Sequence, residues 1–132
     1  MSRIRSRDTK PELVVAAALR RAGVIGWRRQ QKVFGISVDF AWRREKVLVM
    51  VQGCFWHKHN CRRFRMPRTN AAWWERKLKR NAARDREQIQ KFENDGWLCI
   101  KFWECRIHRV DAISAGALVV TVKQQLAKRR PA

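Results

Sequence analysis

The stretch VDFAWRREKVLVMV, residues 38–51, contains two β-rich runs with a polar turn between them. VDFAW and KVLVMV supply the valine and aromatic residues that strands favour, and RREK supplies a short polar connection. This pattern predicts a β-hairpin. The second run is apolar on both of its faces, which is typical of a strand in the middle of a sheet.

The residues before the hairpin predict a helix and a short strand. PELVVAAALRRAG, residues 11–23, is rich in alanine, follows Thr9 in a capping-box pattern and ends at Gly23. WRRQQKV, residues 27–33, fits a short strand.

The residues after the hairpin predict a loop, a long helix, a strand and a last helix. The loop is expected over residues 52–68 and the long helix over residues 69–94, just before Gly96. Apolar residues at helical spacing form the inward stripe of that helix: Trp74, Leu78, Ile89 and Phe92. The same spacing places Asp85 on this stripe, where an acid is unexpected. WLCIKFW predicts a strand, and residues 111–127 predict a helix despite the β-branched VVTV.

The order of elements is therefore helix, three strands, helix, strand and helix. With a length of 132 residues, we expect one domain over residues 1–132, of the α/β class, with a mixed sheet flanked by helices.

The charge of the chain indicates a polyanionic partner. Lys and Arg number 31 against 11 Asp and Glu, and the formal net charge of +20 is spread along the sequence. A merely soluble basic protein is the alternative, but it gives no reason for self-repulsion of this size. The sequence has no apolar run near the roughly 18 residues that a membrane span needs, and MSRIRSRDTK has no apolar signal segment. We expect a cytoplasmic protein with no membrane partner.

A cluster of cysteine and histidine follows the central strand. Cys54, His59 and Cys61 offer three of the four N or S ligands that structural Zn²⁺ takes. The candidates for the fourth ligand are His57, Cys99, Cys105 and His108. A thiol inside a strand usually packs as a small hydrophobe, so Cys105, just past the strand, is our choice over Cys99. Unliganded buried thiols are the alternative.

This choice leaves His57 free for chemistry. It follows the end of the central strand, and the hairpin partner of that strand carries Asp39. Phe55 and Trp56 adjoin it in the same loop. An acid on one strand and a histidine past the next indicate a hydrolytic site.

Four segments in this order, over roughly residues 3–107, resemble the very short patch repair (Vsr) DNA mismatch endonucleases: VDFAW, GCFWHKHNC, TNAAWWERKLKRNAARDR and GWLCIKFWEC. The resemblance implies a restriction-endonuclease-like fold with a structural zinc loop. It also implies an enzyme that uses Mg²⁺ to nick one strand of double-stranded DNA beside a T·G mismatch. A bacterial, nucleoid-associated monomer with mismatch-repair proteins as candidate partners would follow.

The resemblance assigns the catalytic residues position by position. Asp39 matches the metal-binding aspartate, Val51 the residue whose backbone carbonyl also contacts Mg²⁺, and His57 the catalytic histidine. Glu12 and Asp85 match two further acids, either of which could orient His57 or outer-shell waters. The simpler alternatives are that Glu12 only caps its helix and that Asp85 pairs with a nearby arginine.

The resemblance also assigns zinc and DNA contacts. The zinc ligands match the set chosen above from spacing: Cys54, His59, Cys61 and Cys105. The DNA-binding residues comprise three aromatics that wedge into the base stack and two cations: Phe55, Trp56, Trp74, Arg68 and Lys77.

Three features depart from the family pattern. Gln52 stands where the family commonly has an acid or a histidine, and Val38 stands where a proline is usual. The segment before the first helix, which helps to grip DNA in the family, is short. The second functional hypothesis is therefore a catalytically weak, zinc-stapled DNA-binding module.

Overall fold

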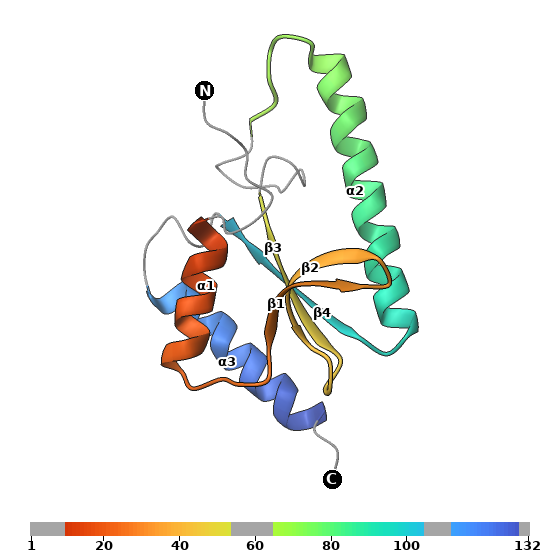
Figure 1. The fold of residues 1–132 in the computed structure, drawn as a ribbon. Helices are drawn as coiled ribbons and strands as arrows, with labels where there is room; N and C mark the ends of the chain where they lie inside the picture. The colour runs from red at the N-terminus through yellow and green to blue at the C-terminus, as the bar shows by residue number, and fades with distance from the viewer. Residues whose placement is uncertain (1–9, 54–64, 105–111, 130–132) are drawn as a thin grey trace.

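The computed structural model describes residues 10–53, 65–104 and 112–129, which form the elements labelled in Figure 1. In chain order these are α1 (Lys10–Arg21), β1 (Arg28–Val33), β2 (Ile36–Trp42), β3 (Val47–Gln52), α2 (Ala71–Asn94), β4 (Leu98–Trp103) and α3 (Ala112–Arg129). The predicted order is confirmed, and the VVTV segment is helical.

Two predicted boundaries were wrong. The long helix begins at Ala71 rather than Thr69, because Asn70 takes a left-handed backbone conformation with φ 56°. The central strand continues through Gln52, which was expected to begin the loop, because Gln52 still pairs with Trp103 on β4.

The four strands form a mixed sheet in the order β1-β2-β3-β4. The β1/β2 and β2/β3 pairs are antiparallel, whereas β3/β4 is parallel. The β2–β3 hairpin and the inner position of β3 were both predicted. Val47, Leu48 and Val49 are fully buried because helices cover both faces of this strand.

The helices divide between the two faces of the sheet (Figure 1). The larger core cluster joins α1 and α3 to the sheet through residues such as Leu19, Phe40 and Val122. A smaller cluster, which includes Phe92 of α2 and Leu48 of β3, fills the other face. The fold class is therefore mixed α/β, with a four-stranded sheet flanked by three helices.

Helix α2 extends beyond the sheet at its N-terminal end (Figure 1). On its predicted inward stripe, Leu78 and Phe92 are buried, whereas Trp74 and Ile89 are half-buried. The sheet therefore holds one end of α2 and leaves the other end projecting.

Candidate active site

Asp39 lies where β2 separates from β3. The last β2–β3 pair toward that end joins Phe40 to Val49. Beyond it, Oδ2 of Asp39 accepts a hydrogen bond of 2.7 Å from the backbone N–H of Val51. The N–H and C=O of one strand residue point to the same side of the strand. The Val51 carbonyl therefore faces the side on which Asp39 lies, so the structure brings these two predicted residues together.

Glu12 reaches the same place from α1. It is 5% exposed and lies on the stripe of Val15, Ala16 and Leu19, which packs α1 against the sheet. Its side chain hydrogen bonds with that of Asp39. Glu12 therefore does more than cap its helix, because its side chain also contacts the sheet.

Two residues of β1 also contact Glu12. Nε2 of Gln30 donates a hydrogen bond of 2.8 Å to Oε2 of Glu12, and Nη2 of Arg29 lies 3.7 Å from the same oxygen. The guanidinium of Arg29 also lies over the ring of Phe40, 5.8 Å from its centroid. The two carboxyl groups are therefore held between α1 and the β1–β2 hairpin.

The pKa of Asp39 is raised from 3.8 to about 7. Burial is the main cause, and the charge and hydrogen bond of Glu12 raise it further. The N–H of Val51 and the charge of Arg29 act in the opposite direction. Without a metal ion, the carboxyl group of Asp39 therefore retains its proton to a pH close to neutral.

The usual alternation of side chains between the two faces of the sheet is interrupted at Gln30 and Asp39. Arg29 pairs with Phe40 on the α1 face, whereas Gln31 pairs with Val38, which packs in the cluster on the α2 face. Gln30 therefore lies opposite Asp39, and its φ of 54° is left-handed. Such a conformation costs a non-glycine residue on the order of 1–3 kcal/mol and clusters at functional sites. Sequence reasoning missed Gln30, since nothing in WRRQQKV distinguishes it from Gln31.

The other described catalytic candidate lies on a helix. Asp85 is half-buried on α2, and α2 packs on the face of the sheet opposite α1 (Figure 1). Gln52 is 2% exposed, and among the described residues its side-chain oxygen has no hydrogen-bond donor.

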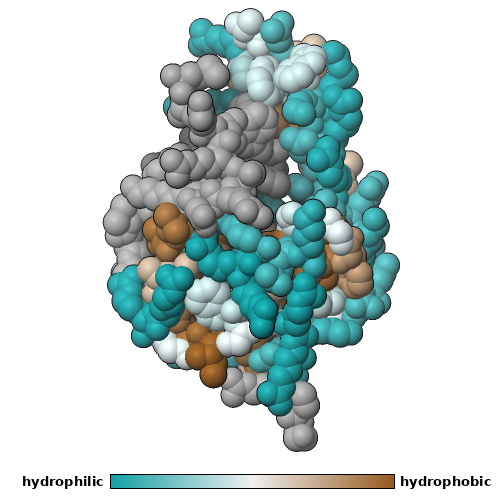
Figure 2. Space-filling view, in the orientation of Figure 1, coloured by the Kyte–Doolittle hydropathy of each residue, from teal (hydrophilic) through white to brown (hydrophobic). Residues whose placement is uncertain are grey.

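The N-terminal end of α2 carries the described DNA-binding candidates. Trp74 and Lys77 are half-buried, and Arg68 is exposed just before the helix. Trp73, which sequence reasoning passed over despite the WW pair, is 47% exposed and packs edge-on against Trp74 with ring centroids 4.9 Å apart. Figure 2 shows a largely hydrophilic surface along α2.

Several predicted residues lie outside the described part of the chain. They are the catalytic candidate His57, the zinc ligands Cys54, His59, Cys61 and Cys105, and the wedge aromatics Phe55 and Trp56. Within the described ranges no group of three His, Cys, Asp or Glu residues could hold a metal ion. Cys99 packs as expected, with its Sγ 3.6 Å from Sδ of Met50, and burial raises the pKa of its thiol to about 11.

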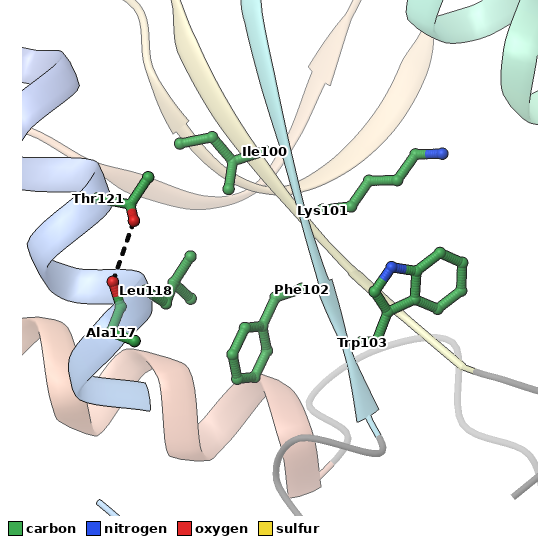
Figure 3. A pocket seen from close by; sticks show the side chains of 7 residues that line it. All are labelled: Ile100, Lys101, Phe102, Trp103, Ala117, Leu118 and Thr121. Carbon is green, nitrogen blue, oxygen red and sulfur yellow. Dashed lines mark hydrogen bonds between the residues drawn. The ribbon is translucent and has the colours of Figure 1, made fainter. Parts of the chain in front are cut away.

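A separate pocket of about 280 Å³ lies between β4 and α3 (Figure 3). Its lining includes Ile100, Phe102 and Leu118, and Lys101 is its charged residue. None of the described residues that line this pocket carries a carboxylate. Among the described helices, none is both long and apolar enough to cross a bilayer.

Comparison with known sequences decides the family. A sequence model described as DNA mismatch endonuclease Vsr matches residues 1–63. The DNA mismatch endonuclease Vsr of Escherichia coli is 30% identical over 124 residues, which cover 94% of this chain and 79% of that enzyme. The chain belongs to the Vsr family.

Other relatives of this Vsr-family chain are nicking enzymes. The type II nicking enzyme V.XorIIP of Xanthomonas oryzae pv. oryzae is 30% identical over 115 residues, covering 87% of this chain and 84% of that enzyme. The type II nicking enzyme V.NmeAIP of Neisseria meningitidis is 32% identical over 107 residues, covering 81% and 76%. The resemblance found in four segments is thus confirmed as family membership.

Proposed function

We propose that this Vsr-family protein is a Mg²⁺-dependent endonuclease that nicks one strand of duplex DNA beside a T·G mismatch. That it is an endonuclease that nicks DNA follows from family membership. The observation that carries the catalytic proposal is the contact of Asp39 with Val51, next to the buried carboxyl group of Glu12.

The residues at this place fit Mg²⁺. Mg²⁺ prefers oxygen ligands and binds through one or two carboxylates while retaining several waters. Asp39 and the Val51 carbonyl would hold the ion, and Glu12 would bind its waters. The raised pKa of Asp39 supports this, because a nearby cation would relieve the cost of two adjacent buried carboxylates. Bound there, Mg²⁺ would stabilise the negative charge that grows on the scissile phosphate.

The remaining catalytic roles go to His57 and Asp85. His57 would take a proton from the attacking water, a role that histidine commonly fills. Since Glu12 lies beside Asp39 on the α1 face, we assign Glu12 to the waters of the metal. Asp85, on the α2 face, is then left to orient His57.

We further propose that the sheet is a restriction-endonuclease-like core, with a zinc loop that mounts two of the wedge aromatics. The zinc ligands would be Cys54, His59, Cys61 and Cys105. Inserting an aromatic between base steps costs a few kcal/mol of stacking, and least at a mispair, which favours mismatched sites. The protein would act as a monomer on DNA in the cytoplasm, at the nucleoid, with mismatch-repair proteins as candidate partners.

A nicking assay tests this function. The substrate is a duplex with a single T·G pair and a different label on each strand, and a T·A duplex of the same sequence is the control. We expect one strand of the T·G duplex to be cut near the mismatch when Mg²⁺ is present. We expect no cutting in EDTA and slower cutting of the control duplex.

The alternative function predicts a different result. If the protein binds the T·G duplex but cuts neither strand at any Mg²⁺ or Mn²⁺ concentration, the zinc-stapled DNA-binding module replaces the endonuclease. The feature that favours this alternative is Gln52, which cannot act as a general base.

A further inference from the structure

Gln30 combines a strained backbone with a hydrogen bond to the buried carboxylate at the candidate site. It lies on β1 opposite Asp39, and its φ of 54° is unusual for a residue with a side chain. Its Nε2 donates to Oε2 of Glu12 over 2.8 Å. A residue held in a sparsely populated conformation persists only where its surroundings fix it, and such residues cluster at functional sites.

Two donors on β1 compete for Glu12. Nη2 of Arg29 is 3.7 Å from Oε2, beyond the roughly 2.7–2.9 Å of a charge-assisted hydrogen bond, whereas the amide of Gln30 is in contact. A guanidinium prefers to bind both oxygens of a carboxylate. Without the Gln30 amide, the guanidinium of Arg29 would still lie near Oε2 of Glu12, but at a longer distance than a hydrogen bond.

We propose that Gln30 is a positioning residue, whose amide holds the Glu12 carboxylate toward Asp39 so that the metal site is arranged before the ion binds. This proposal rests on the proposed function, in which Asp39 binds Mg²⁺. Glu12 sits 5% exposed between α1 and the hairpin, so its orientation is set by contacts within the protein rather than by solvent.

Gln31 is a matched control. It has the same side chain at the next position of the same strand, but its Nε2 donates to the backbone carbonyl of Arg29 over 3.0 Å. A general effect of removing a glutamine amide from β1 would therefore appear in both positions. An effect through Glu12 would appear only at position 30.

The test measures metal binding directly. Wild type, Gln30→Ala, Gln30→Glu and Gln31→Ala are bound to a T·G duplex with an uncleavable linkage, and bound Mn²⁺ is counted by electron paramagnetic resonance. We expect Gln30→Ala to raise the Mn²⁺ concentration at half-saturation about 10-fold, as for loss of other outer-shell partners. Gln30→Glu keeps the shape but cannot donate and repels Glu12, so it should raise that concentration further. Gln31→Ala should match wild type.

Single-turnover nicking provides the second measurement. In Gln30→Ala the rate should fall at low Mg²⁺ and recover to within about threefold of wild type at saturating Mg²⁺, because Gln30 arranges the site without touching the substrate. Purely structural damage would lower the amount of active protein equally at every Mg²⁺ concentration.

Gln30→Gly separates the amide from the backbone. Glycine adopts positive φ without strain, so the melting temperature should not fall, yet metal binding should weaken as in Gln30→Ala. The proposal is overturned if Gln30→Gly binds Mn²⁺ like wild type, or if Gln30→Ala and Gln31→Ala behave alike. Wild type that binds no Mn²⁺ in the DNA complex would overturn the proposed function instead.

Discussion

The Asp39 site and the N-terminal end of α2 place their polar groups in opposite environments. At the first, Glu12 is 5% exposed, and one oxygen of each carboxyl group accepts a hydrogen bond from Gln30 on β1 or Val51 on β3. At the second, Trp73 is 47% exposed and Arg68 lies on the surface. Catalysis depends on a few groups held close to the atoms where charge develops in the transition state. The free energy of DNA binding is instead spread over contacts of many cations with phosphates. Single substitutions should therefore have large effects at the first region and smaller ones at the second.

The largest expected effect is the loss of nicking in Asp39→Asn. The amide keeps the shape but removes the main protein charge on the metal, so we expect the rate to fall by at least about 10²–10³-fold. DNA affinity should stay equal or rise slightly, because one negative charge is removed from a protein of net charge +20. Single-turnover nicking and fluorescence anisotropy measure the two quantities.

Asp95→Asn is the control for that experiment. Asp95 is an exposed acid after α2, and its carboxylate lies 3.7 Å from Nζ of Lys46, just before β3. It removes the same charge without touching the site, and its nicking rate should be unchanged. Equal losses in both variants would show that Asp39 acts only through overall charge.

The next effect is on mismatch preference at α2. Replacing Trp74 by alanine removes an aromatic that we propose stacks on the bases, and such stacking contributes about 1–3 kcal/mol. The preference for T·G over T·A duplexes should therefore fall by about 10-fold, more than the affinity for matched DNA falls. Competition binding with both duplexes measures this, and Trp73→Ala shows whether its partner in the edge-on pair contributes. An equal loss on both duplexes would make Trp74 a generic contact.

The pH dependence of stability provides a third test. Asp39 has a folded-state pKa of about 7 against 3.8 in the unfolded chain, so the folded state binds the extra proton between these values. Its contribution to stability is therefore complete below pH 4 and is lost as the pH rises to 7. Because the group is partly accessible, we expect about 2 kcal/mol, roughly half of what the full shift would give.

Asp39→Asn isolates that contribution from the other acids. The free energy of unfolding of wild type minus that of Asp39→Asn should decrease by this amount between pH 4 and pH 7 in metal-free urea titrations. A difference that is constant with pH would mean that Asp39 is ionised at neutral pH despite its burial. Addition of Mg²⁺ at pH 7 should stabilise wild type and leave the variant unchanged.

The two regions also differ in how far the sequence predicted them. The hairpin of VDFAW, RREK and KVLVMV is specified by local residue types, so it was predicted correctly. The α2 boundary was placed two residues early, although Asn70 is a residue type that favours both helix N-caps and left-handed backbone. The resemblance named Asp39 and Glu12, but their contact comes from packing α1 against the sheet. Spacing placed Glu12 on the stripe of Leu19, a signal that was available and not used.

Substitutions of Gln52 should have the smallest effect on the nicking rate, even though Gln52 is buried. It ends β3 next to Val51, is 2% exposed, and its side-chain oxygen has no donor among the residues that the structure describes. Leaving a buried acceptor without a donor costs about 1–3 kcal/mol, so this oxygen is suited to accept a hydrogen bond from a group beyond the described residues. If the amide only fills space, Gln52→Asp should raise nicking several-fold by adding a second carboxylate near the metal, and if it orients a water, the change should lower nicking. We expect the gain.

Gln52→Glu and Gln52→Leu decide between the two roles. The space-filling role predicts that Gln52→Leu retains the wild-type nicking rate, and the water-orienting role predicts that Gln52→Leu loses it. A decrease in both Gln52→Asp and Gln52→Leu, in variants with unchanged melting temperature, would contradict our expectation and make the Gln52 amide part of the catalytic site.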